Sequence, residues 1–200
     1  MQLNSPLFHS PITLSHHYWD LLLSSGDVVI DATCGNGKDT LFLAQKVLPQ
    51  GFVVGLDVQT QAIENTLALL QNNLPQELLT QVHLFQQSHD NFPDIAYQKK
   101  ISLIVYNLGY LPGGDKRLTT ACSSTVKSIQ KALDLVSPGG AISITCYPGH
   151  EEGAKEEILL KGIFSTLPQD AWNVCHHTWV NREKAPSLFL LQKKPNQSFL

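Results

Sequence analysis

The chain has 200 residues, of which 42% are hydrophobic and 16% are charged, and its formal net charge at pH 7 is −3. This length and composition exclude intrinsic disorder and predict one domain, residues 1–200, with a sizeable core. A slightly acidic chain lacks the broad cationic surface that binds long nucleic acids non-specifically. Neither a membrane-spanning apolar run nor a signal-peptide pattern is found, so we expect a cytoplasmic protein.

The cysteines and histidines do not form a metal-binding pattern. The four cysteines are far apart in the sequence and contain no C-x-x-C pair. Two histidine pairs occur, His16-His17 and His176-His177, but adjacent residues of a regular element point in different directions. We therefore predict neither a metal site nor a disulfide framework.

Helix-like and strand-like segments alternate along the chain. In chain order we expect a helix over 15–24, a strand over 28–30, a helix over 38–48, a strand over 52–56, a helix over 61–73, strands over 82–86 and 101–106, a helix over 119–136, a strand over 141–146, a helix over 151–167, and strands over 171–180 and 187–193. Ser15 is expected to cap the first helix, and Pro138-Gly139-Gly140 to end the fourth.

The spacing of these elements predicts the fold class. Short apolar strands separated by helices are typical of a parallel sheet that is covered on both faces. The last two strands are joined only by the loop 181–186, which is too short for a parallel crossover. The sequence thus predicts an α/β fold with a seven-stranded, mostly parallel, doubly wound sheet that ends in an antiparallel hairpin.

Ligands of such sheets bind outside the carboxyl ends of the strands, where this chain has a glycine-rich turn. Gly35 and Gly37 follow the first strand and let the backbone approach a ligand. Asp57 follows the second strand about 20 residues later, the spacing at which a carboxylate accepts hydrogen bonds from ribose hydroxyls. These residues indicate an adenosine ligand, although an ordinary turn and a helix cap are the alternative.

The rest of the turn narrows the choice of ligand. A dinucleotide motif requires a third glycine where this chain has Thr40. No phosphate-binding G-x-x-x-x-G-K-[ST] motif is present. Asp31, four residues before G-x-G, suits a ligand with a positively charged amino group. S-adenosylmethionine meets all these conditions, and Ser88 or His89 after the third strand could bond its adenine. Alternatively, Ser88 caps a helix and His89 is solvated.

The fourth strand is followed by residues that suit an amine acceptor. Asn107 supplies a carbonyl that can orient an N–H group, and a small residue and the aromatic Tyr110 come next. Methyl transfer is an in-line displacement in which positioning supplies much of the acceleration. The attacking amine must be uncharged, although an alkylamine resembles lysine with a pKa of roughly 10. A turn that uses Asn and Gly only for its geometry is the alternative.

Several segments together resemble one family: DATCGNGKDTLFLA, GLDVQTQAI, the SHD after the third strand, NLGYLPGGDK and YPGHEEGAKE. Over residues 16–186 the chain is similar to the class I methyltransferase family long labelled putative ribosomal RNA methylase. Members of this family methylate 5-aminomethyl-2-thiouridine at the wobble position of tRNA. The long NLGYLPGGDK segment and GNGxDT are the most specific parts of the resemblance.

The resemblance implies a Rossmann-like class I fold, S-adenosylmethionine as cofactor and a homodimer. It places the cofactor against Asn36, Gly37, Asp57, Gln59, Ser88 and His89, and the acceptor beside Asn107 and Tyr110. His150, within the segment YPGHEEGAKE, could take the proton that the amine sheds. A histidine at a helix start that bonds only to backbone is an equally good interpretation.

The implied reaction converts 5-aminomethyl-2-thiouridine to 5-methylaminomethyl-2-thiouridine in the tRNA anticodon stem-loop, where the base is unpaired. We expect some basic residues near the site to meet anticodon-stem phosphates; the candidates are Lys116, Arg117, Lys127, Lys131, Arg182 and Lys184. Three alternatives remain open: methylation of ribosomal RNA, methylation of a small-molecule amine, and a non-catalytic module that binds S-adenosylmethionine.

Overall fold

The structure is a computed structural model that describes residues 10–109 and 122–195. Its helices are α1 (Pro11–Leu22), α2 (Lys38–Val47), α3 (Thr60–Asn73), the 3-10 helix η1 (Gln76–Gln81), α4 (Asp94–Tyr97), α5 (Cys122–Leu135) and α6 (Glu151–Ser165). Its strands are β1 (Val28–Asp31), β2 (Phe52–Asp57), β3 (Val82–Gln86), β4 (Ile101–Leu108), β5 (Val136–Cys146), β6 (Trp172–His177) and β7 (Ser187–Lys193).

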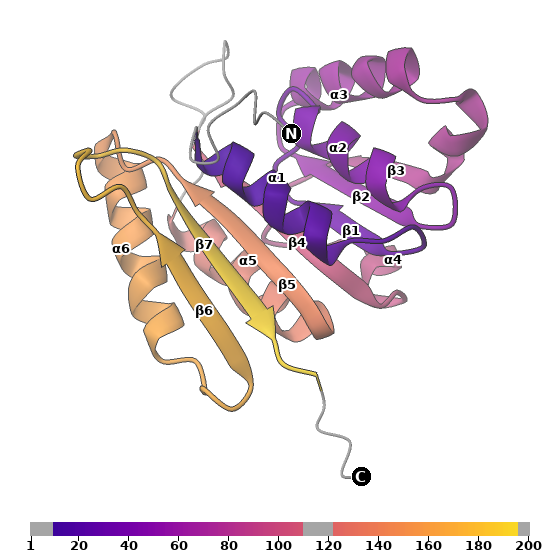
Figure 1. Cartoon of the computed structure of the whole chain (residues 1–200). Coiled ribbons are helices and arrows are strands. Elements are labelled where there is room, and N and C mark those ends of the chain that lie inside the picture. The colour runs from indigo at the N-terminus through magenta and orange to yellow at the C-terminus, as the bar shows by residue number, and fades with distance from the viewer. Residues whose placement is uncertain (1–9, 110–121, 196–200) are drawn as a thin grey trace, which may run out of the picture.

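The strands form one seven-stranded sheet in the order β3-β2-β1-β4-β5-β7-β6 (Figure 1). The first five strands run parallel to one another, whereas β7 is antiparallel to both β5 and β6. This confirms the predicted α/β sheet with its C-terminal antiparallel hairpin. The strand order reverses between β1 and β4, and ligands of open α/β sheets bind at such a reversal.

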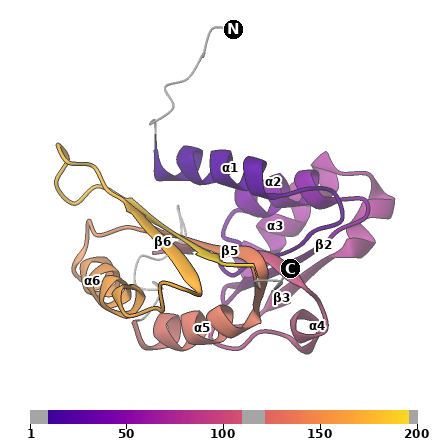
Figure 2. The same cartoon turned by 60° about the horizontal axis from the view of Figure 1, so that its bottom comes forward.

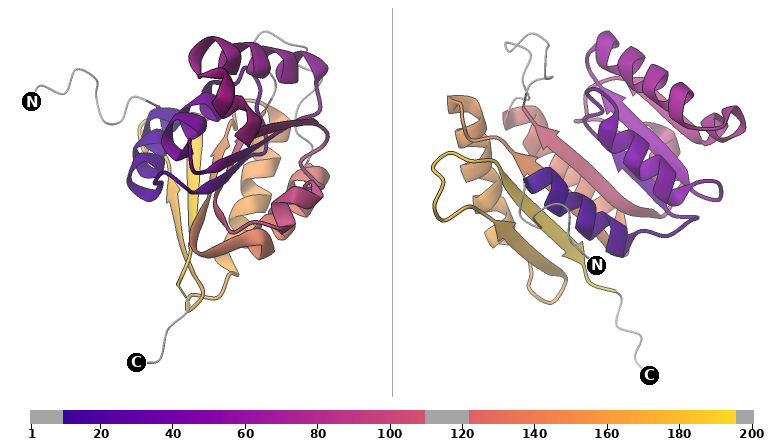
Figure 3. Two further views of the ribbon diagram at one scale, coloured as in Figure 1. Left: turned by 90° about the vertical axis from the view of Figure 1, so that its right-hand side faces the viewer. Right: turned by 45° about the horizontal axis from the view of Figure 1, so that its top comes forward.

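Helices cover both faces of the sheet, with α1 and α2 on one side and α5 and α6 on the other (Figure 2). Alternate residues of each strand supply the two cores. On β4, Leu103 and Val105 pack on the α1–α2 side, whereas Ile104 and Tyr106 pack on the other side. Helix α1 lies over strands β5 and β7 (Figure 3).

The structure differs from the sequence-based expectation at several element ends. Helix α1 begins at Pro11 and is capped by Ser10, whose Oγ accepts from the Thr13 N–H. Ser15, the predicted cap, instead lies buried inside the helix and donates to the Pro11 carbonyl. A proline at the first helical position is favourable because its missing N–H has no partner there.

Residues 138–140 belong to the strand β5 rather than to a loop that ends helix α5. Helix α5 ends at Leu135, and β5 begins at the next residue with an irregular register against β4. Strand β6 stops at His177, so the predicted segment 171–180 is too long at both ends. The 3-10 helix and α4 were not predicted, because short helices carry little periodic signal.

Within the described ranges, 10–109 and 122–195, no helix is long and apolar enough to cross a lipid bilayer. They also contain no group of three or more His, Cys, Asp or Glu side chains placed to hold a metal ion.

Candidate active site

The turn after β1 is organised around the buried carboxylate of Asp31. One oxygen accepts from the Thr33 N–H at 3.1 Å, and the other accepts from the Thr40 hydroxyl at 2.6 Å. Burial, and next the nearby charge of Asp39, raise the pKa of Asp31 to about 7. The side chain is fully buried, and the contact of Asp31 with a cofactor amino group stays a prediction. Asp31 fixes the shape of the turn.

The two glycines of the turn adopt a left-handed backbone, with φ of 54° at Gly35 and 79° at Gly37. A Cβ atom at Gly37 would lie only 2.7 Å from the Cα of Thr66 in α3. Gly37 is the N-cap of α2 and provides no capping side chain. The first N–H groups of α2 are therefore not capped by this residue, and N–H groups of this kind attract an electron-rich ligand atom.

Asp57, at the end of β2, is held with its carboxylate facing the same turn. Its Oδ2 accepts from the Gly35 N–H at 3.0 Å, and its Oδ1 accepts from the Gln59 N–H at 2.9 Å. Each oxygen retains a further lone pair, and the residue is only half-buried. This arrangement fits a ribose diol, which donates two hydrogen bonds. Asn36 lies beside it and accepts from Asn65 of α3 at 3.0 Å.

The loop after β3 places His89 in the interior. His89 is 8% exposed, packs edge-on against Tyr106 at 5.9 Å, and its carbonyl accepts from the Ser128 hydroxyl at 2.7 Å. The alternative interpretation, in which His89 is solvated, is thus wrong. Its Nε2 is buried without a hydrogen-bond partner among the residues that the structure describes, and it is available to bond a water or a ligand atom. Desolvation lowers the pKa of His89, which keeps the ring uncharged.

Ser88 does not cap a helix. Its hydroxyl accepts from the Asp90 N–H at 3.3 Å within the loop, whereas the N-cap of α4 is Pro93. The hydroxyl is half-buried beside His89, so both predicted base contacts lie in the loop that follows β3.

Asn107 is joined to α2 and α1 by a chain of hydrogen bonds. Its Nδ2 donates to Asp39 Oδ2 at 2.7 Å, and Asp39 Oδ1 accepts from His16 Nε2 at 2.6 Å. The backbone N–H of Asn107 donates to the Thr33 hydroxyl at 2.7 Å. A carboxylate only accepts hydrogen bonds, so Asp39 fixes which end of the amide is the NH₂ group. The Asn107 carbonyl oxygen is thereby presented as the acceptor.

Tyr147 follows β5 and borders the same region. Its ring lies beside Gly109, where a Cβ atom would approach it to 3.5 Å. Burial, and next the charge of Asp39, raise the pKa of Tyr147 to about 12, so its phenol is uncharged at neutral pH. Tyr110, the aromatic residue predicted to hold the acceptor, lies outside the described residues.

His150 is the N-cap of α6, and its Nδ1 accepts from the Gly153 N–H at 3.1 Å. Its Nδ1 could take a proton from substrate only after this cap is broken, since the lone pair is already used. His150 thus makes the backbone contact expected of a histidine at a helix start. Its role in proton transfer stays a prediction.

The described members of the six predicted basic residues lie in two different regions. Lys127 pairs with Asp90 at 3.2 Å, and Lys131 donates to the Asp90 carbonyl at 2.8 Å, so both support the loop after β3. Arg182 and Lys184 are exposed in the loop between β6 and β7. Lys116 and Arg117 lie outside the described residues.

Asp39 and His16 were missed as site residues by the sequence analysis. Asp39 stands inside the GNGxDT motif, where its identity was noted but no role was assigned. His16 lies 23 positions away from Asp39 in the chain, and nothing in local spacing connects the two. Only the packing of α1 on α2, where His16 stacks on Phe42 at 4.1 Å, brings them together.

The known proteins that are similar to this chain are named as RNA methylases or methyltransferases. The family model "Putative rRNA methylase" matches residues 53–193. A "tRNA (mnm(5)s(2)U34)-methyltransferase, chloroplastic" from Arabidopsis thaliana is 35% identical over 189 residues, which cover 92% of this chain and 69% of that protein.

Solved structures agree with this. A "putative rRNA-methylase" from Clostridium thermocellum superposes with a TM-score of 0.85 at 32% identity, over 93% of this chain and 98% of that one. A putative methyltransferase from Streptococcus mutans, crystallised in complex with SAH, has a TM-score of 0.78 at 29% identity, over 93% and 99% of the two chains.

Proposed function

The chain belongs to the "Putative rRNA methylase" family, and within it we propose that the substrate is the 5-aminomethyl-2-thiouridine at the wobble position of tRNA. The protein is an S-adenosylmethionine-dependent RNA methyltransferase. The proposed product is 5-methylaminomethyl-2-thiouridine. This choice of substrate is supported by the name of the Arabidopsis relative and by an acceptor geometry that suits an amine.

The residues of the turn fit S-adenosylmethionine. The Asp57 carboxylate, with one N–H bond to each oxygen, matches the two ribose hydroxyls. His89, with its buried Nε2 unpartnered among the described residues, and Ser88 are placed to bond the adenine. Gly35, Asn36, Gly37 and Gln59 complete the proposed cofactor contacts. Asp31 is proposed to attract the positively charged amino group of the cofactor, and its bonds to Thr33 and Thr40 shape the turn. When bound, the cofactor supplies a methyl group on a positively charged sulfur.

The single observation that carries the proposal is the fixed amide of Asn107. Because its NH₂ group is bonded to Asp39, its carbonyl oxygen can accept one N–H of the substrate amine. This contact aims the nitrogen lone pair along the line of attack. A fixed acceptor of this kind reduces the entropy that must be lost in reaching the transition state.

The proposed reaction transfers one methyl group from sulfur to nitrogen and releases one proton. A bond forms between the amine nitrogen and the methyl carbon, the carbon–sulfur bond breaks, and its electron pair stays on sulfur. The methylated nitrogen then loses one proton. Candidates for the acceptor of this proton are His150, Tyr110 and water. Since the attacking amine must be neutral, kcat/KM should rise with pH toward the pKa of the amine, which is roughly 10 for a lysine-like group.

The RNA partner is proposed to be the anticodon stem-loop, which offers the target base unpaired at low cost. Arg182 and Lys184, both exposed, are proposed to meet its phosphates. Association into a homodimer stays a prediction.

Purified protein tests the proposal directly. It is incubated with labelled S-adenosylmethionine and either an anticodon stem-loop carrying 5-aminomethyl-2-thiouridine, the free nucleoside, or ribosomal RNA. We expect label only in the stem-loop. Label confined to ribosomal RNA would support the older family description, whereas equal turnover of the free nucleoside would indicate a small-molecule enzyme. Binding of the cofactor without turnover of any substrate would indicate a non-catalytic module.

A further inference from the structure

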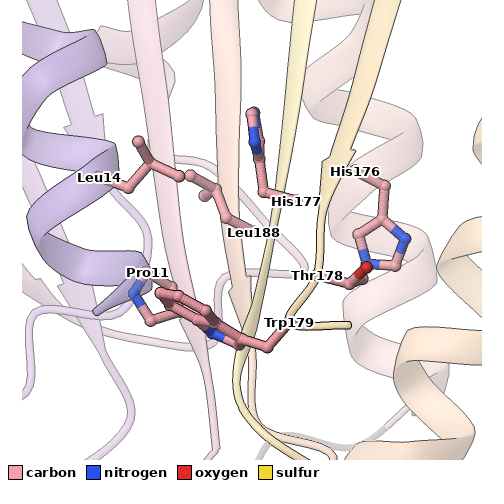
Figure 4. Close-up of a pocket in the computed structure, with 7 residues that line it drawn as sticks. All are labelled: Pro11, Leu14, His176, His177, Thr178, Trp179 and Leu188. Atoms are coloured by element: carbon pink, nitrogen blue, oxygen red, sulfur yellow. The ribbon is translucent and has the colours of Figure 1, made fainter. Parts of the chain in front are cut away.

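A cavity of about 250 Å³ lies between the start of α1 and the end of the β6–β7 hairpin (Figure 4). It is lined by Pro11, Leu14, His176, His177, Thr178, Trp179 and Leu188. Pockets for drug-sized ligands measure roughly 300–1,000 Å³. The cavity is therefore suited to a single planar group rather than to a complete nucleotide.

The sheet connects this cavity to the acceptor site. Asn107 pairs with Thr145, Thr145 pairs with Leu188, and Leu188 pairs with His177. Paired residues of a sheet point to the same face, and neighbouring strands are about 4.8 Å apart. The cavity floor at Leu188 is thus about two strand spacings, roughly 10 Å, from Asn107, on the face that α1 covers.

Helix α1 also spans both sites. His16 bonds to Asp39, which holds Asn107, while Tyr18 bonds to His177 at 3.2 Å. Pro11 and Leu14, one to two turns earlier, line the cavity. Helix α1 therefore lines the cavity directly and is linked to Asn107 through Asp39.

Trp179 gives the cavity a fixed aromatic wall. Its indole N–H donates to the Pro186 carbonyl at 3.0 Å, which holds the ring in place. The guanidinium carbon of Arg182 lies 4.5 Å from the ring centroid. Unpaired RNA bases are bound on aromatic rings, and the Trp179 ring that lines the cavity offers such a surface. The exposed Thr178 adds a hydroxyl that can bond a base edge.

The charges around the cavity suit an RNA strand. The exposed loop beside Trp179 carries Arg182 and Lys184 against one carboxylate, Glu183. A chain whose net charge is −3 thus presents a local excess of positive charge where a phosphate next to the bound base would lie. Phosphate contacts of this kind position an RNA without reading its sequence.

We propose that this cavity is a second nucleobase subsite, which takes the base of a nucleotide next to the one that is methylated. The inference rests on the proposed function, because it assumes a single-stranded RNA substrate. Its occupant is a purine or pyrimidine ring that stacks on Trp179, while Arg182 and Lys184 meet the adjoining phosphates. Such a subsite would favour an anticodon loop over the free nucleoside.

The test measures binding of an unmodified anticodon stem-loop by fluorescence anisotropy, so that it does not depend on methylation. Trp179→Ala should weaken binding by about 5- to 150-fold, the effect of losing one base–aromatic stack. Trp179→Phe should retain most of the affinity because it keeps an aromatic ring. Val180→Ala, at a fully exposed neighbour outside the cavity, is the matched control and should bind like the wild type.

An abasic nucleotide on either side of the wobble position provides the second arm of a double-mutant cycle. One of the two abasic RNAs should bind wild-type protein as weakly as intact RNA binds Trp179→Ala, and the two losses should not multiply. Binding of the abasic RNAs to the wild-type protein is informative even if Trp179→Ala folds poorly, because it requires no protein variant. Losses that multiply, or two abasic RNAs that both bind normally, would overturn the subsite.

The outcomes separate the two proposals. If the wild type methylates the aminomethyl stem-loop but shows no coupling between Trp179 and a flanking base, only the subsite is wrong. If coupled binding is found but the wobble amine is not methylated, only the substrate assignment is wrong. Absence of any binding to the stem-loop would overturn both.

Discussion

Removal of the hydrogen bond between Asp39 and Asn107 should lower the rate of methyl transfer. Replacing Asp39 with Ala leaves the Asn107 NH₂ group without the acceptor that it contacts at 2.7 Å, so both orientations of the amide become populated. A hydrogen bond to a charged group contributes about 1.5–3 kcal/mol. If the transition state requires the carbonyl-outward orientation, kcat should fall by about 10- to 150-fold.

The assay separates a positioning role from a merely structural one. Initial rates on the aminomethyl stem-loop give kcat and KM, and calorimetry gives the Kd of S-adenosylmethionine. We expect the loss in kcat, with little change in the cofactor Kd, because Asp39 has no proposed contact with the cofactor. Asp39→Asn should retain more activity than Asp39→Ala, since its amide oxygen can still accept from Asn107.

His16→Phe tests the other hydrogen bond to Asp39. It keeps an aromatic ring stacked on Phe42 and removes the ring N–H that bonds Asp39. It should lower kcat less than Asp39→Ala, and the double variant should be no slower than Asp39→Ala alone. Wild-type kcat in Asp39→Ala, or a loss that appears only as weaker cofactor binding, would refute the reasoning.

Three further predictions concern the turn. Asp57→Asn should raise the Kd of S-adenosylmethionine by about 10- to 150-fold, since a charged acceptor for the ribose is lost; an unchanged Kd in calorimetry would place the ribose elsewhere. Gly37→Ala should lower the free energy of unfolding by about 1–3 kcal/mol or more in urea titrations, because φ is 79° and a Cβ would meet Thr66; wild-type stability would contradict this. Asp31 has a pKa of about 7 in the folded protein against 3.8 ordinarily, so the folded state keeps a proton that the unfolded chain has lost. Its contribution to the free energy of unfolding should therefore fall by up to about 1.4 kcal/mol per unit from pH 4 to pH 7, and stay constant above about pH 8. The stability of Asp31→Asn relative to wild type should rise over that range, and a pH-independent difference would refute the assignment.

The fold could be predicted because its signals are local. Each strand is a short apolar run, the connections are long enough for helices, and the final loop is too short for a crossover. The order β3-β2-β1-β4-β5-β7-β6 was beyond this reasoning, since it depends on which edges pack together. The extension of β5 back to Val136 was missed because a Pro-Gly-Gly segment normally ends elements, and here it forms an irregular strand start instead.

The sequence indicated residues at the strand ends but not the hydrogen-bond network that holds them. Strand ends locate Asp57, His89 and Asn107, because parallel strands place their carboxyl ends along one edge. What holds those side chains comes from distant segments: His16 of α1 reaches Asp39, and Ser128 of α5 anchors the loop of His89. Such tertiary contacts leave no periodic trace in a single sequence.

Methylation of the amine of the wobble nucleoside can be tested by mass spectrometry of wobble nucleosides from cells that lack the protein. We expect that 5-aminomethyl-2-thiouridine accumulates and its methylated form disappears, and that both changes are reversed by the wild-type chain but not by an Asn107→Ala variant. A normal nucleoside profile in those cells would contradict it.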